Sequence, residues 1–71
     1  MTDETVTDLV EMELPFGRRA RLREVRHESG LRMIRLILRE GKRITQVDMD
    51  EVSAMRLGQA LTGAAADGER P

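Results

Sequence analysis

The sequence contains no cysteine, no tryptophan and no tyrosine, and its one aromatic residue is Phe16. Without cysteine, the chain has no disulfide framework, no thiolate zinc site and no iron–sulfur cluster. Its longest purely apolar run is three residues, as in residues 36–38, so no segment is expected to span a membrane. The acidic start also lacks the basic flank and apolar core of a secretory signal. Together with the length of 71 residues, these absences predict one small, soluble, cytoplasmic domain.

The net charge of −1 hides three segments of unlike charge. Residues 1–17 hold five acidic and no basic residues, residues 18–43 hold ten basic and three acidic residues, and residues 44–71 hold five acidic and two basic residues. Such asymmetry can mark a surface for nucleic acid or an acidic partner, or segments that neutralise one another in the fold. The sequence pI of 5.8 favours neutralisation, because phosphate-binding domains more often have a pI above about 9.

The first strand is predicted from apolar residues that alternate with acidic ones up to Leu14. The loop Pro15–Gly17 then predicts a hairpin, because three-residue loops usually end in the left-handed conformation, where glycine costs least. This loop sets the pairs Leu14–Arg18, Glu13–Arg19, Met12–Ala20, Glu11–Arg21 and Val10–Leu22. One face of the hairpin is then apolar and the other is a ladder of Glu–Arg pairs.

Two further strands are predicted after the turn Glu28–Gly30. The third, residues 31–39, is apolar on both faces, which is typical of a central strand. Its register pairs Val25 with Met33, Leu22 with Leu36, Ala20 with Leu38, and Arg23 with Arg35. This places two positive charges opposite each other, a mild conflict that glutamates on neighbouring strands can neutralise. The register of the fourth strand, residues 43–49, is not determined by the sequence, because Val47 and Met49 favour one face and Ile44 favours the other.

The C-terminal helix is predicted to begin at Asp50 as its N-cap, with Glu51 adding negative charge near the helix N-terminus. Asp48 is an alternative cap, because Glu51 follows it with capping-box spacing. One side of the helix carries Ala54, Leu57, Leu61, Ala64 and Ala65. Either Gly63 or the end of the alanine run closes the helix.

The fold class predicted from these elements is α+β: an antiparallel four-strand meander with one C-terminal helix packed on one face. Residues 1–7 are expected to form a flexible N-terminus, residues 8–65 a single small domain, and residues 66–71 a flexible C-terminus.

Self-association is predicted because a core this small rarely supplies more than ~3–5 kcal/mol of stability. The sheet face that one helix cannot cover carries Leu9, Val25, Met33, Ile37 and Ile44. We therefore predict a homodimer that is joined through that face or through an edge strand. The alternative is a monomer with scattered apolar residues on its surface.

Catalytic and metal-binding patterns are weak in this sequence. His27 is the only imidazole, and its neighbours Glu24, Glu28 and Ser29 cluster at an exposed turn. The carboxylates of residues 48–51 are explained by helix capping, and residues 41–43 lack the upstream glycine and following Ser/Thr of a P-loop. We predict that the protein is not an enzyme and binds neither a cofactor nor a metal.

The arginines are the main functional feature, because a guanidinium binds phosphates and carboxylates bidentately. The candidate surface for a partner or nucleic acid consists of the arginines outside the ladder: Arg26, Arg32, Arg35, Arg39 and Arg43. We predict a small non-enzymatic interaction or accessory protein that self-associates, with an acidic protein as a further candidate partner. The alternative is a weak nucleic-acid-binding protein that uses these arginines.

Two resemblances concern the later half of the chain. The segment of residues 31–61 contains RMIRLILREGKRITQVDMDEVSAMRLGQAL and resembles short bacterial proteins classed as domains of unknown function. The order of strands and helix also resembles single-stranded-DNA-binding transcriptional coactivator domains, whose strand face carries basic and aromatic residues. The strands here have the basic residues without the aromatic ones, and no site residue is carried over from either resemblance.

Overall fold

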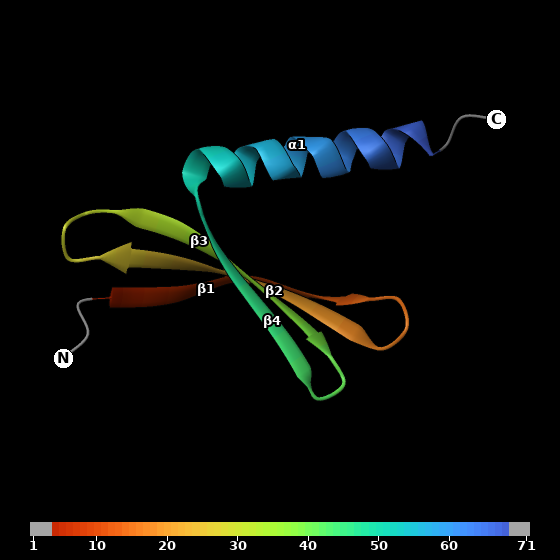
Figure 1. Ribbon diagram of the computed structural model, residues 1–71, viewed down its shortest axis with the longest axis horizontal. Helices are drawn as coiled ribbons and strands as arrows, with labels where there is room; N and C mark the ends of the chain where they lie inside the picture. Colours follow the sequence, from red (N-terminus) through yellow and green to blue (C-terminus); the bar gives the residue numbers. More distant parts are fainter. Residues whose placement is uncertain (1–3, 69–71) are drawn as a thin grey trace.

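A computed structural model describes residues 4–68 as one antiparallel sheet followed by a helix. The elements are β1 (Glu4–Leu14), β2 (Arg18–His27), β3 (Arg32–Glu40), β4 (Arg43–Asp50) and α1 (Glu51–Asp67). The strand order is β1-β2-β3-β4, so each strand pairs with the next one in the sequence. Figure 1 shows this meander, with α1 leaving the end of β4. The predicted α+β fold class is therefore confirmed.

The β1–β2 hairpin has the predicted register, and all five predicted pairs are present. Phe16 and Gly17 adopt φ values of 66° and 72°, so the loop ends in the left-handed conformation that glycine permits. The strand extends further back than expected, because residues 4–7 pair with β2. A bulge between Asp8 and Val10 makes this possible and leaves Leu9 without a partner on β2.

The register of the other strands settles the face on which each side chain lies. The predicted β2–β3 pairs are present, including the pair of Arg23 with Arg35. In β4, Val47 lies opposite Leu36, whereas Ile44 lies opposite Arg39. Val47 and Ile44 therefore lie on opposite faces, as their conflicting spacing in the sequence requires.

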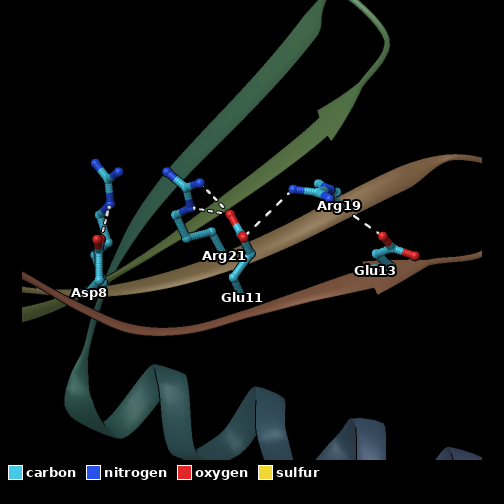
Figure 2. Close-up of polar contacts among 6 residues, drawn as sticks. Asp8, Glu11, Glu13, Arg19 and Arg21 are labelled. Carbon is cyan, nitrogen blue, oxygen red and sulfur yellow. Dashed lines mark hydrogen bonds and ion pairs between the residues drawn. The ribbon is translucent and has the colours of Figure 1, made fainter.

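The sheet has one predominantly apolar face and one face with many charges. The central part of the apolar face, called face A, consists of Val10, Met12, Ala20, Leu22, Ile34, Leu36, Leu38, Val47 and Met49. The other face, called face B, carries the Glu–Arg ladder together with Val6, Val25, Met33, Ile37 and Ile44. The ladder side chains lie on the side of the sheet away from α1, so α1 lies on the side of face A (Figure 2). The helix contacts β3 and β4 and makes no contact with β1 or β2.

The helix begins at the predicted cap. The backbone N–H of Ser53 donates to Oδ1 of Asp50 at 3.0 Å, and β4 runs into α1 with no intervening residue. Asp48 as the cap was wrong, because its carboxylate belongs to β4 and binds Arg35. Helix termination at Gly63 was also wrong: the strong helix formers of the alanine run continue the helix to Asp67.

Only Val25 is fully buried among residues 4–68, and it lies on face B between Val6 and Met33. No residue of α1 is buried. Of the predicted flexible ends, residues 1–3 and 69–71 lie outside the described residues, whereas residues 4–7 belong to β1 and residues 66 and 67 belong to α1. No helix in the described part of the chain is long and apolar enough to cross a membrane.

Candidate interaction surfaces

The ladder on face B joins β1 to β2 through ion pairs (Figure 2). The guanidinium of Arg21 donates to the carboxylate of Glu11, with Nε at 2.9 Å from Oε2. Arg19 lies 3.4 Å from Glu13 and 3.6 Å from Glu11. These contacts hold the pKa of Glu11 below its ordinary value, first through the hydrogen bond from Arg21 and then through the charge of Arg21. The ladder therefore neutralises part of the basic segment within the sheet.

The like-charged pair of Arg23 and Arg35 is relieved by two aspartates from the outer strands, rather than by glutamates. Nε of Arg23 lies 2.7 Å from Oδ1 of Asp8. Arg35 binds Asp48 bidentately, with nitrogen–oxygen distances of 2.7 and 3.0 Å. The side chain of Arg35 is only 16% exposed, which makes it the least exposed arginine of the sheet's ion pairs. Each central arginine thus has its own carboxylate, and the two cations share a sheet face without an unpaired charge.

The Arg35–Asp48 pair predicts a loss of stability in acid. The hydrogen bond from Arg35 lowers the pKa of Asp48 in the folded chain, and the positive charge of Arg35 adds to this effect. A carboxylate with a lowered folded pKa stabilises the fold above its unfolded pKa of about 4, and this stability is lost as the pH falls through the folded pKa. Thermal unfolding followed by circular dichroism between neutral and acidic pH should therefore show a falling Tm. The Asp48→Asn and Arg35→Gln variants should each have a flatter curve, and a curve unchanged from the native one would contradict the assignment.

The five candidate arginines do not gather on one surface. Arg26, Arg32 and Arg43 lie on the same side of the sheet as face A, whereas Arg35 and Arg39 lie on face B. Three of them already contact carboxylates, as shown by the pairs Arg26–Glu24, Arg32–Glu24, Arg32–Glu51 and Arg35–Asp48. Arg39 donates to the carbonyl oxygen of Gly41 at 3.3 Å. Arg43 is exposed at the start of β4.

Among residues 4–68, the one ion-pair partner of the single imidazole is a carboxylate of β1. Nδ1 of His27 lies 3.9 Å from the carboxylate of Glu4 on the adjacent strand. Of the neighbours considered from sequence, Glu24 is held by Arg32 on the other side of the sheet. Within residues 4–68, no group of three or more His, Cys, Asp or Glu residues could hold a metal ion.

The feature that sequence reasoning missed is the exposure of the apolar surface facing α1. Met12 is 49% exposed on face A and Leu61 is 63% exposed on the helix, although both were expected to lie between sheet and helix. Because α1 starts directly at the end of β4, with no loop between them, it contacts β3 and β4 and does not lie across β1 and β2. The sequence carried a signal of this, because the predicted cap follows the fourth strand immediately.

The chain matches one protein-family model over residues 3–67, and the family is described as Family of unknown function (DUF6967). The chain belongs to this family. The matched region of this DUF6967 protein covers all four strands and α1, so the sheet and the helix together form the family's domain. No curated protein and no solved structure matches the chain. The resemblance to transcriptional coactivator domains stays a prediction from sequence.

Proposed function

We propose that this chain is a small, non-enzymatic interaction protein that acts by self-association. The observation that carries the proposal is the amount of apolar surface left outside the core. Val25 is the only fully buried side chain among the described residues, while twelve large apolar side chains are exposed. Five of them share one side of the molecule, because Val10, Met12 and Val47 lie on face A and Leu57 and Leu61 lie on one side of α1. Apolar side chains gathered in this way favour a role in protein association, because soluble monomers rarely expose large contiguous apolar patches.

The charged groups support an interaction role over a catalytic one. Of the twelve basic residues, most of those on the sheet are engaged by carboxylates, and these pairs stabilise the strand register. Carboxylates held in this way are not poised to exchange protons with a substrate. A cytoplasmic location is part of the proposal, because the absence of cysteine is typical of a chain that does not depend on an oxidising compartment.

Sedimentation equilibrium on the full chain, over a range of concentrations that reaches high micromolar, tests the proposal. We expect an average mass that rises from 8.1 kDa toward twice that value as the concentration increases. A mass that stays at 8.1 kDa throughout would contradict self-association.

Fluorescence polarisation with single- and double-stranded oligonucleotides at low and high salt tests the alternative function, which is nucleic-acid binding. Salt-sensitive binding to the protein would favour the nucleic-acid alternative, because neutralised phosphates release counterions.

A further inference from the structure

The apolar surface is divided into two parts that do not cover each other within one chain. One part is the half of face A on β1 and β2, formed by Val10, Met12, Ala20 and Leu22. The other part is the stripe along α1 formed by Ala54, Leu57, Leu61, Ala64 and Ala65. The helix reaches only β3 and β4, so the stripe and the β1–β2 half of face A remain apart. Figure 1 shows α1 close to the sheet at its N-terminal end and farther away toward its C-terminal end.

The β4–α1 junction sets the direction of the helix. No residue separates β4 from α1, and the carboxylate of Asp50 caps the first turn. A guanidinium nitrogen of Arg32 lies 2.8 Å from the carboxylate of Glu51, which ties the first helical residue to β3. These contacts fix where the helix starts, and there is no loop that could swing it across to β1 and β2.

The chain exposes more surface than a compact monomer of its mass, and the difference is large enough for a dimer interface. The chain exposes 5966 Å², whereas a folded monomer of 8.1 kDa is expected to expose about 4,500 Å². The excess of about 1,500 Å² is roughly twice the ~800 Å² that each partner contributes to a standard interface, and it is within the range of obligate dimers. The radius of gyration agrees, since it is 14.4 Å where a compact domain of this length has about 11 Å.

The chemistry of face A is that of an interface, with an apolar centre and a charged margin. At one end, Glu24, Arg26, Arg32 and Glu51 form a cluster of ion pairs. At the other end, Nε of Arg18 lies 2.7 Å from the carboxylate of Glu40. Between these ends, face A and the α1 stripe contain no charged side chain. A surface of this kind can be covered by an apolar partner without leaving a buried charge unpaired.

We propose that a second copy of this chain covers the surface, with α1 of each protomer packed on the β1–β2 half of face A of its partner. The inference rests on the proposed self-association and names its geometry. A two-fold axis makes the exchange reciprocal, so both apolar parts of both chains become buried at once. The Glu–Arg ladder of face B stays in solvent, so this geometry differs from the prediction from sequence of a dimer joined through face B or through an edge strand.

Cysteine cross-linking tests this geometry directly, because the native chain has no cysteine. The Met12→Cys and Leu61→Cys variants, one of them carrying a mass tag, are mixed, unfolded together, refolded and treated with a short bismaleimide. We expect a cross-link between the two different chains, identified by peptide mass. The matched control replaces Met12→Cys by Glu11→Cys, which lies next to it on β1 and faces the opposite side of the sheet. This control should give little cross-link to Leu61→Cys.

The other outcomes separate this inference from the proposed function. A dimer by sedimentation without the cross-link between the two variants would overturn the helix exchange and leave self-association standing. A single chain that carries both Met12→Cys and Leu61→Cys and cross-links only within itself would also overturn the exchange. A monomer at all concentrations would overturn both proposals.

A pair of helix variants gives a second readout in solution. Leu61→Glu places a charge in the stripe and should raise the dimer Kd by at least about 30-fold, as loss of an interface anchor does. Val52→Glu is the control, because Val52 is 64% exposed and lies on the side of α1 opposite Ala54 and Leu61. Equal dimer affinities for the two variants would overturn the proposed contact of the stripe with the partner.

Discussion

The Val25→Lys variant is expected to leave the chain unfolded at neutral pH. Val25 has no exposed surface and lies between Val6 and Met33 on face B, so a lysine there needs to bury an ammonium group. Its neighbours two positions away on the same face are Arg23 and His27, and the carboxylates nearest to them, Asp8 and Glu4, already contact these two residues. Burial of an unpaired charge costs several kcal/mol, which is comparable to the ~3–5 kcal/mol that a core of this size supplies.

Circular dichroism of the Val25→Lys chain should show loss of the strand signal, and Val25→Ala should keep the fold with a lower Tm. Val52→Lys is the matched control, because it makes the same change at an exposed position of α1 and should stay folded. A folded Val25→Lys chain with the native Tm would show that this part of face B is open to water and has no structural core.

Reversal of the ladder charges is the second large effect, and we expect the Arg19→Glu/Arg21→Glu double variant to lower the Tm by about 5–10 °C. The change removes the contacts of Arg21 with Glu11 and of Arg19 with Glu13, and it places four carboxylates on adjacent positions of β1 and β2. Like charges directly opposite each other in a sheet destabilise it. Thermal unfolding of native and variant chains at one fixed concentration measures the difference.

The swapped variant is the control for the ladder. Adding Glu11→Arg and Glu13→Arg to the double variant exchanges the two sides of the ladder and should restore most of the lost Tm. A double variant as stable as the native chain would contradict the structural role of Arg19 and Arg21 and leave them available for a partner. Restoration by the swap would show that cross-strand pairing, rather than the arginine side chains as such, carries the effect.

The sheet could be predicted from sequence because its determinants are local. Gly17 fixes the length of the first loop, and the alternation around Met12 leaves one register in which the apolar and charged residues separate. Asp50 was identified as the cap for the same reason, since its carboxylate acts on a backbone N–H only three residues away. The bulge at Leu9 was missed, because an extra residue in a strand leaves the alternation on each side of it intact while changing the face.

The candidate site was harder to predict, because it depends on contacts between distant segments. Arg35 was left without a partner in the sequence reasoning, although Asp48 lies directly opposite it once β4 is in register. Arg32 likewise binds Glu51, nineteen positions along the chain, across the start of the helix. Because the sequence did not determine the register of the fourth strand, neither pairing could be predicted. The division of the arginines between the two faces could not be predicted for the same reason.

The sequence by itself determined the order of the strands, the β1–β2 register from Val10 onward, the β2–β3 register, the ladder and the start of the helix. Each of these follows from alternation, turn residues or a cap within a few positions. Only the tertiary structure decided the direction of α1. The sequence already placed the cap directly after the fourth strand. The ion pair of Arg32 with Glu51, which joins positions nineteen residues apart, and the path of the helix past β3 and β4 follow only from the fold. The lack of cysteine excluded a disulfide framework, and the path of the helix determined which apolar side chains of the sheet stay exposed.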